Sequence, residues 1–513
     1  MGNLTFRVHT APDVYDAHVL HSSTRASAVG PASPTHPSPP VRPGPVIAAL
    51  AAGGVLVSLA QTLIIPLITQ LPQIFNTSAA NASWIITVTL LAGAVSTPIT
   101  GRLADLYGKK LMLLLALAAF IVGALVSAAA PGLGAMIAGR AMQGVAAGLI
   151  PLGISLMHDL LPRDRAGKAI ALMSASMGIG GSLGLPLAAA VAQFANWRIL
   201  FLSVALVAAL IAAALMWLIP TVPASSHRAG SFDVFGALGL TAGLVALLLA
   251  ISKGSDWGWT SAATLGSAAG AVLVLSLWGL HQTRKRHPLV NLRTAAIPAV
   301  LLTNIASILI GFTMYAMNLL LPPVIQLPVD LGYGLGQSMV AMGLWIFPMG
   351  IGMVAASNLG AAISRKHSPR ITLIVAGLVA AAGHGSVFAV LATIGNRAPG
   401  PADAGTIALT LILVSLASAI IGAGIALALG AIPALILSVV PVTETAAANG
   451  LNALMRSLGT TSAAAVLGVI LASLTHQAGG LAVPTLGGYL TGLGLTTGIA
   501  LAASAVAAFI PRR

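Results

Sequence analysis

The chain has 513 residues, of which 57% are hydrophobic and only 7% are charged, and its formal net charge at pH 7 is +14. Most of the hydrophobic residues lie in unbroken apolar runs of about 20 residues, the length that an α-helix needs to cross a hydrocarbon layer of about 30 Å. This composition excludes a soluble domain. The basic residues lie between the apolar runs, so membrane topology explains the charge better than nucleic-acid binding does.

Residues 1–44 differ from the rest of the chain. They are polar, rich in Ser, Pro and His, and have too little apolar content to bury a core, so we expect a disordered cytoplasmic tail. No short apolar run precedes a small-residue cleavage site there, so the first span is expected to direct membrane insertion. The sequence contains no cysteine, which leaves the redox compartment unreadable.

The apolar runs predict fourteen transmembrane helices in blocks of six, two and six. We expect an all-α polytopic protein with one six-helix bundle over 45–219, two additional spans with their linkers over 220–298, and a second six-helix bundle over 299–513. The predicted spans are 45–68, 83–99, 111–130, 135–156, 169–191, 199–219, 234–251, 262–280, 299–321, 338–362, 371–394, 406–429, 446–471 and 487–510.

The basic residues predict the orientation of these spans, because Lys and Arg in short loops stay on the cytoplasmic side. With the N-terminus inside, the loops on the outer side hold only Arg198, Lys253 and Arg397. One miscounted span would invert every later loop and destroy this asymmetry. The sequence therefore predicts a multi-pass protein with both termini in the cytoplasm. We expect it in the plasma membrane, which is the inner membrane in a cell that has two membranes.

The loop after the second span reads Gly-Arg-Leu-Ala-Asp-Leu-Tyr-Gly-Lys-Lys over residues 101–110. Its glycines permit a tight turn against neighbouring helices, and its carboxylate and cations can form a polar latch at the cytoplasmic rim. The alternative is a charged loop that only anchors two spans. The loop resembles the signature loop of the major facilitator superfamily, although Leu106 stands where a basic residue is usual. The residues that carry the resemblance are Gly101, Arg102, Asp105, Gly108, Lys109 and Lys110.

The fourth span contains Arg140, Gln143 and Gly144, which share one helical face. An arginine inside a span is energetically unfavourable and normally faces a partner or a water-filled cavity. The alternative interpretation is that the cation of Arg140 reaches the lipid head groups. The pattern is similar to the second motif of the same superfamily.

In the fifth span, Gly180, Gly184 and Pro186 are expected to permit close helix packing and a bend. This segment resembles the superfamily's antiporter motif, with departures, because Leu185 separates the glycine from the proline. In the thirteenth span, Asn449, Asn452 and Arg456 follow one stripe that carries polar groups into the membrane.

From about residue 46 to residue 513 the chain resembles the 14-span drug:proton antiporter branch of the major facilitator superfamily. This resemblance implies two pseudosymmetric bundles around a central cavity, with the seventh and eighth spans at the periphery, and transport by rocking of the bundles about a midplane site. It nominates the following contacts along the substrate path: Gln61, Thr62, Arg140, Gln143, Asn304, Tyr315 and Asn318, with Asn452 and Arg456 nearby.

The ionisable residues limit the chemistry. All ten acidic residues fall in the tail, the loops or the ends of spans, and Gln61 stands where many relatives carry an acid that can bind a proton. A cationic interior without carboxylates favours neutral or anionic substrates. His384 is the only histidine well inside a span, and we expect a structural role for it over proton carriage.

The leading hypothesis is a monomeric, proton-coupled secondary transporter that exports amphiphilic small molecules from the cell. The alternatives are an uncoupled or lipid-directed facilitator, and a membrane sensor or scaffold that does not transport. We expect no enzyme, no cofactor and no metal, because phosphate-loop, Cys/His and Ser-His-Asp signatures are absent from the sequence. We also expect Asp105 to contact the start of the thirteenth span near 443–447, in a cluster with Glu444 and a cation from Arg102, Lys109 or Lys110.

Overall fold

The computed structural model describes Gly2 and residues 43–511, apart from 68–70, 78, 83, 221–231, 286–287, 395–403, 442–443 and 479–480. The predicted tail over 1–44 thus falls almost wholly outside the described residues, and so does Thr443. Residues Met1–Pro40 and Val41–Arg513 are separate units, and the fold is that of the second unit.

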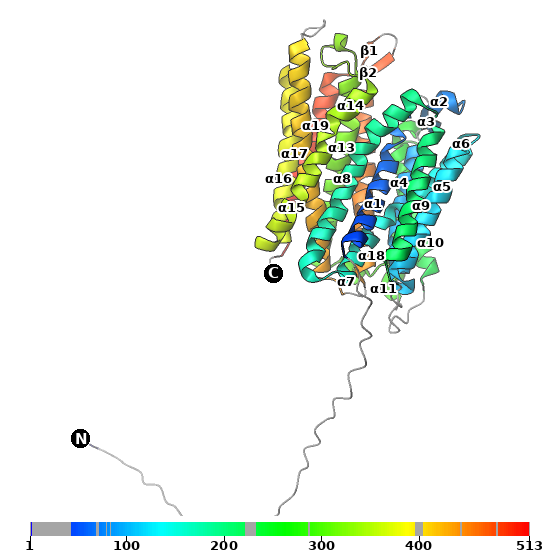
Figure 1. The fold of residues 1–513 in the computed structure, drawn as a ribbon, viewed down its shortest axis with the longest axis vertical. Helices are drawn as coiled ribbons and strands as arrows, with labels where there is room; N and C mark the ends of the chain where they lie inside the picture. Colours follow the sequence, from blue (N-terminus) through cyan, green and yellow to red (C-terminus); the bar gives the residue numbers. More distant parts are fainter. Residues whose placement is uncertain are drawn as a thin grey trace, which may run out of the picture. The chain divides into compact units, whose positions relative to one another are not determined.

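Fourteen helical segments in the described part are long and apolar enough to cross a membrane, which confirms the predicted span count. Most of them run along one common direction (Figure 1). The segments are α1 (Pro43–Thr62), α4 (Trp84–Tyr107), α5 (Lys109–Ala128), α6 (Leu133–Val145) with α7 (Leu149–Leu160), α8 (Arg163–Phe194), α9 (Arg198–Leu218), α10 (Val234–Trp257), α11 (Ala262–Arg284), α13 (Pro298–Gln326), α14 (Met339–Ile346) with α15 (Pro348–Lys366), α16 (Pro369–Ile394), α17 (Ala404–Leu437), α18 (Thr445–Ser473) and α19 (Leu486–Ala508).

Two spans are interrupted. The 3-10 turn η2 (Ala146–Gly148) separates α6 from α7, and α14 gives way to α15 at Phe347. Pro348 occupies the first turn of α15, where its missing N–H costs least. The shorter elements are η1 (Ile65–Leu67), α2 (Leu71–Ile74), α3 (Ala79–Ala82), α12 (Leu292–Ala295), η3 (Val329–Leu331) and the antiparallel strands β1 (Thr475–Ala478) and β2 (Leu481–Pro484), in which Thr475 pairs with Pro484.

Each half of the chain has its own apolar core. One cluster of buried side chains comes almost entirely from residues 46–219, and the other comes from residues 300–510. Because lipid tails are as apolar as leucine, such cores hold together through close packing more than through the hydrophobic effect. The two predicted six-helix bundles correspond to these two cores.

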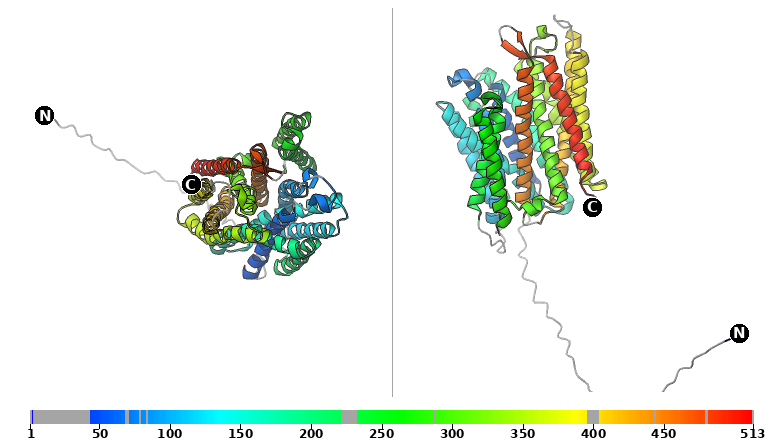
Figure 2. Two further views of the ribbon diagram at one scale, coloured as in Figure 1. Left: turned by 90° about the horizontal axis from the view of Figure 1, so that it is seen from above. Right: turned by 180° about the vertical axis from the view of Figure 1, so that it is seen from behind.

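The added helix α10 packs on the seam between the bundles. Its residues Leu240, Leu244 and Leu248 form a third buried cluster with Ala94 of α4 and Leu454 of α18. In the apolar stretch of 18 residues that could cross the membrane, only 11% of the residues of α11 are buried, against 39% of those of α10. Seen end-on, the α10–α11 pair lies at the edge of the helix array (Figure 2). The pair is therefore peripheral, as expected, and α10 touches both halves.

A buried carboxylate holds this pair together just outside the span. Asp233 caps α10 by accepting the Gly236 N–H at 3.0 Å, and from α11 it receives Gln282 Nε2 at 2.8 Å and His281 Nε2 at 3.2 Å. Lys285 Nζ lies 3.8 Å from the same carboxylate. Burial alone raises the pKa of Asp233, but these hydrogen bonds outweigh burial and lower the pKa below its usual value.

Candidate functional site

The two glycines of the 101–110 loop have different structural roles. Gly108 joins α4 to α5 with φ +102°, a backbone conformation that L side chains rarely adopt. Gly101 lies inside α4, where an added Cβ would come within 2.8 Å of the Ala446 carbonyl oxygen of α18. The first glycine in the motif thus permits close approach of two helices, and the second permits the turn. We call the end of the protein that carries this turn the signature-loop end.

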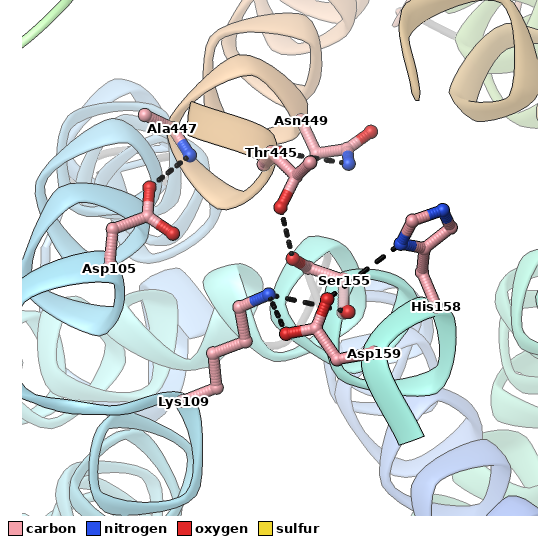
Figure 3. A network of polar contacts seen from close by, with 8 residues as sticks. All are labelled: Asp105, Lys109, Ser155, His158, Asp159, Thr445, Ala447 and Asn449. Atoms are coloured by element: carbon pink, nitrogen blue, oxygen red, sulfur yellow. Dashed lines mark hydrogen bonds and ion pairs between the residues drawn. The ribbon is translucent and has the colours of Figure 1, made fainter. Parts of the chain in front are cut away.

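At the signature-loop end a carboxylate from one bundle caps a helix of the other. Asp105, which is 2% exposed, accepts the Ala447 backbone N–H at 3.1 Å (Figure 3). The first N–H groups of a helix have no partner within it, and the N-cap residue Glu444 provides no side-chain cap. Asp105 therefore takes the position of a capping residue for α18, which is the contact expected from the sequence.

A second polar group lies beside this cap. Lys109 Nζ is 2.5 Å from Asp159 Oδ2 and donates to the Ser155 carbonyl oxygen at 3.4 Å, so it ties α5 to α7. The Ser155 and Thr445 hydroxyl oxygens are 3.1 Å apart, which makes a further contact between the bundles (Figure 3). Asp105–Ala447 and Ser155–Thr445 thus connect the two bundles at the signature-loop end, as far as the structure describes it.

The expected cluster of both acids around a shared cation was wrong. Glu444 accepts hydrogen bonds from Asn291 Nδ2 at 3.0 Å and from Thr294 Oγ1 at 2.8 Å, so its charge is turned toward the linker that contains α12. Lys109 is paired with Asp159, and Lys110 Nζ donates to the Met216 and Ile219 carbonyl oxygens at 2.9 and 2.5 Å. The C-terminal ends of α9 and α7 therefore hold these lysines, because the carbonyl oxygens of Met216 and Ile219 and the carboxylate of Asp159 are negative partners there. Arg102 is half-buried near the C-terminal end of α4.

A central cavity of about 170 Å³ lies between the two bundles. Its walls come from α1, α4, α7 and α8 of the first bundle and from α13, α14, α15 and α18 of the second. Most of the lining is apolar. Four methionines contribute to it, and these flexible side chains adapt to ligands of different shape. The nominated residues that line the cavity are Gln61, Thr62, Tyr315, Asn318 and Arg456.

Arg456 is the charged group of this cavity. Its side chain is half-buried and makes no hydrogen bond or ion pair with any residue that the structure describes. Among the described residues of the lining there is also no carboxylate. A guanidinium carries five N–H donors and stays charged at any physiological pH, so its donors face the cavity unpaired. The site is chemically suited to an anion or to a hydrogen-bond acceptor.

Arg140 has a different environment. It is 1% exposed and donates to the Ala60 carbonyl at 3.0 Å, to the Ile85 carbonyl at 3.3 Å and to Gln143 Oε1 at 2.7 Å. These acceptors belong to α1, α4 and α6, so Arg140 joins three helices of one bundle. Neither Arg140 nor Gln143 is among the residues that line the central cavity.

The asparagines nominated from the sequence also face one another. Asn452 Nδ2 of α18 donates to Asn304 Oδ1 at 2.9 Å and to Ser307 Oγ at 2.7 Å, and all three residues are buried. They join α18 to α13 outside the cavity lining. Arg140, Asn304 and Asn452 thus form polar contacts between helices, and Gln143 accepts from Arg140 within α6. A helical stripe in the sequence does not distinguish these roles from contact with substrate.

The small residues of α8 bring three helices together. A Cβ on Gly180 would overlap the Val55 carbonyl of α1, and one on Gly184 would overlap the Thr62 hydroxyl. Pro186 lies against Gly343 of α14, in the opposite bundle. His384 of α16 is fully buried, with Nδ1 2.8 Å from the Ala380 carbonyl oxygen, and it lies outside the cavity lining.

The sequence did not predict which residues complete the contacts at the signature-loop end. Ser155 and Asp159 lie in an otherwise apolar helix and its end, and Asn291 reads as an ordinary N-cap for α12, which it also is. No local pattern indicates that Ser155 meets Thr445, because the two are 290 positions apart in the chain. The one signal in the sequence was the opposite charge of Asp159 and of the lysines at 109 and 110, which allows an ion pair between them.

Comparison with known proteins agrees with this architecture. Residues 50–464 match the family described as the Major Facilitator Superfamily. The chain is 28% identical to the tetracenomycin C resistance and export protein of Streptomyces glaucescens, over 84% of this chain and 76% of that protein. It is 24% identical to multidrug resistance protein 3 of Bacillus subtilis (strain 168), over 76% of this chain and 72% of that protein.

Among solved structures, the major facilitator proton:xylose symporter XylE superposes with a TM-score of 0.60 at 15% identity, covering 91% of this chain and 95% of that one. This likeness concerns the fold. The family match over residues 50–464, together with the fourteen spans, identifies the chain as a member of the major facilitator superfamily.

Proposed function

We propose that this protein exports neutral or anionic amphiphilic small molecules by alternating access. The observation that carries the proposal is Arg456, a cation without a counter-ion among the described residues, in a cavity whose other walls are mostly apolar. The names of two relatives, a resistance and export protein and a multidrug resistance protein, support the direction of transport and a broad substrate range.

The cavity offers an amphiphile both kinds of contact. Met314, Met349 and Met353 supply adaptable apolar surface, while Arg456 and Asn318 supply hydrogen-bond donors. Binding pockets for small molecules generally combine apolar walls with a few polar groups that fix orientation. A lipophilic cation would meet Arg456 without any carboxylate from the described lining to offset the repulsion.

The contacts at the signature-loop end supply the conformational switch of the proposed cycle. Asp105 and Ala447 belong to different bundles, and so do Ser155 and Thr445, so both contacts must break when the bundles rock apart at this end. The positive-inside rule assigns this end to the cytoplasm. In the proposed cycle the present state is therefore closed toward the cytoplasm.

The driving ion in the leading proposal is the proton, as in the antiporter branch that the sequence resembles. A second candidate, an uncoupled facilitator, is favoured by one observation: the described lining contains neither a carboxylate nor a histidine. An anion that leaves a cell with a negative interior gains about 2.3 kcal/mol per elementary charge for each 100 mV. Export of an anion can therefore proceed on the membrane potential alone.

The test is dye transport in proteoliposomes with wild-type protein, Arg456→Ala and Arg456→Lys. We expect Arg456→Ala to lower transport of an anionic dye at least tenfold and transport of a neutral dye much less, with part of the anionic transport restored in Arg456→Lys. Anionic-dye transport at the wild-type rate in Arg456→Ala would overturn the proposal.

The same vesicles separate the two energy sources. Valinomycin with a potassium gradient imposes a potential without a pH difference, and a buffer jump with the potential clamped imposes the reverse. Proton coupling predicts that the pH difference alone drives accumulation of the dye. Accumulation on the potential alone would favour the uncoupled facilitator, and the absence of transport for all dyes would favour a scaffold.

A further inference from the structure

A second cavity lies beside the central one. It measures about 190 Å³ and is enclosed by α4, α10, α13 and α18. We call it the side cavity; its lining combines apolar side chains with the hydroxyl-bearing residues Thr87, Tyr315 and Thr461. It is lined by Trp84, Ile86, Thr87, Leu90, Leu91, Leu248, Leu249, Tyr315, Thr461, Ala464 and Ala465.

The side cavity and the central cavity share a wall. Ile86 and Leu90 of α4 and Tyr315 of α13 line both. The partition between the two spaces is therefore made of side chains and not of a helix backbone. Rotation of side chains such as these is a fast and small motion compared with the rocking of a bundle.

The side cavity exists because the seam between α4 and α18 is tight in only one half. Toward the signature-loop end, Gly101 lies against Ala446, and Gly450 lies against Thr97. Toward the other end the residues that face each other are Trp84 and Thr87 on α4 and Ala464 and Ala465 on α18, with the space between them covered by α10. The added helix α10 thus forms the outer wall of a gap that opens only away from the Asp105 latch.

We propose that the side cavity binds the alkyl chain of a single-chain anionic amphiphile whose head group lies at Arg456. This inference rests on the proposed function and names its substrate class. Arg456 and Thr460 of α18 line the central cavity, and Thr461, Ala464 and Ala465 of the same helix line the side cavity. The two linings therefore occupy adjoining faces of α18, and they meet at Thr460 and Ala464, which are about one helical turn apart.

The chemistry of the walls suits a hydrocarbon chain. The Thr461 hydroxyl donates to the Ser457 carbonyl of its own helix at 3.0 Å, so it does not require a polar partner in the cavity. Apolar cavities of about 150 Å³ stay free of water and take up hydrophobic molecules as large as benzene. At about 190 Å³ the side cavity is large enough for such a molecule, and each methylene group that moves from water against its apolar side chains should improve affinity about fourfold.

The available space favours one chain over two. The central cavity of about 170 Å³ must hold the head group, and the side cavity of about 190 Å³ must hold the hydrocarbon. At the far end of the side cavity, Lys253 Nζ of α10 lies 5.3 Å from the centre of the Trp84 ring. This cation–π pair closes that end. The geometry therefore points to a substrate with one alkyl chain and one negative head group.

Photo-crosslinking locates the chain directly. The probe is dodecyl sulfonate with a diazirine at the end of its alkyl chain, applied to the full-length protein in proteoliposomes. We expect crosslinks on Leu248 or Leu249 of α10 and on Ala464 or Ala465 of α18, and we expect an excess of unlabelled dodecyl sulfonate to abolish them. Crosslinks at these residues that do not compete would show probe dissolved in the bilayer, and would overturn the inference.

Two variants on adjacent positions of α18 make the test specific. Ala465→Phe fills the side cavity, whereas Val466→Phe adds the same ring at a position that is 41% exposed and outside both linings. In Ala465→Phe, the affinity for dodecyl sulfonate should fall at least tenfold while the affinity for butyl sulfonate is kept. Val466→Phe should bind both probes as the wild type does.

The outcomes separate this inference from the proposed function. Competable crosslinks confined to the central cavity, together with unchanged dodecyl sulfonate binding in Ala465→Phe, would overturn the role of the side cavity and leave the proposed function intact. If neither sulfonate bound in a manner that depends on Arg456, the proposed function would fail and this inference with it. Should Ala465→Phe not fold, the crosslink map of the wild-type protein decides alone.

Discussion

Replacing Asp105 with asparagine should make the signature-loop end open more often. Asparagine has nearly the same size and keeps an oxygen that can accept the Ala447 N–H, but it removes the negative charge at the N-terminus of α18. A carboxylate near a helix N-terminus contributes about 0.3–1 kcal/mol at an exposed site and up to about 2 kcal/mol in a partly buried geometry. Because Asp105 is 2% exposed, the upper part of that range applies.

The expected shift in the conformational equilibrium follows from this energy. A loss of about 1–2 kcal/mol lowers the ratio of closed to open protein by about fivefold to about thirtyfold, since every 1.4 kcal/mol corresponds to a factor of ten. The Ser155–Thr445 contact stays in place in the closed state and limits the change. The variant should therefore populate both states and transport an anionic dye more slowly than the wild type does.

The natural absence of cysteine makes the measurement direct. Lys168→Cys in α8 and His367→Cys after α15 introduce two exposed labelling sites on different bundles near the signature-loop end. Spin labels at these sites report the distance across that end by double electron–electron resonance. We expect Asp105→Asn to move a large part of the distribution toward longer distances.

The matched control is Asp330→Asn. Asp330 is an exposed acid in η3, at the opposite end of the helices, so the variant removes the same charge without touching the latch. Its distance distribution should equal that of the wild type. If Asp105→Asn also gave the wild-type distribution, the reasoning about the shared cap would be refuted.

Three further predictions follow from other contacts. Arg140→Ala leaves the buried Gln143 Oε1 without its donor, at about 1–3 kcal/mol, so the melting temperature in detergent should fall while the range of transported dyes is kept; altered selectivity at an unchanged melting temperature would contradict this. Gln61→Glu adds a titratable group to the central cavity, so transport should become dependent on pH and cationic dyes should be accepted, and an unchanged pH profile would count against its position in the lining. Asp233 has a lowered pKa, so its stabilising contribution is present above the unfolded-state pKa of about 3.9 and is lost as the pH falls through the lower folded value; Asp233→Asn should lower the melting temperature at neutral pH and weaken its fall in acid, whereas parallel pH curves would contradict the assignment.

Much of the fold follows from hydropathy because a spanning helix must satisfy its backbone internally over a fixed length. The predicted span 299–321 corresponds to α13 (Pro298–Gln326), and 487–510 corresponds to α19 (Leu486–Ala508). The interruptions of the fourth and tenth spans were not predicted, since Gly148 and Pro348 are also common in continuous transmembrane helices. The β1–β2 hairpin was missed because strands of four residues carry little periodic signal.

The site was harder to predict than the fold. The helical period correctly groups Arg140 with Gln143, but it does not say whether that face meets a cavity or the carbonyl oxygens of Ala60 and Ile85. Arg456 has the same sequence appearance and faces the cavity. What separates the two arginines is which backbone acceptors come within reach, and that depends on tertiary packing that no local pattern records.

The cap that α18 receives from the other bundle also couples the transport cycle to hydration. While Asp105 is in place, the Ala447 amide is satisfied by a protein oxygen in a buried setting. When the bundles separate, that amide and its carboxylate partner must each be solvated, so opening takes up water at a helix end that was dry. Solutes that are excluded from protein surfaces oppose such uptake. The balance between the two states is therefore expected to depend on the osmotic strength of the compartment that this end faces.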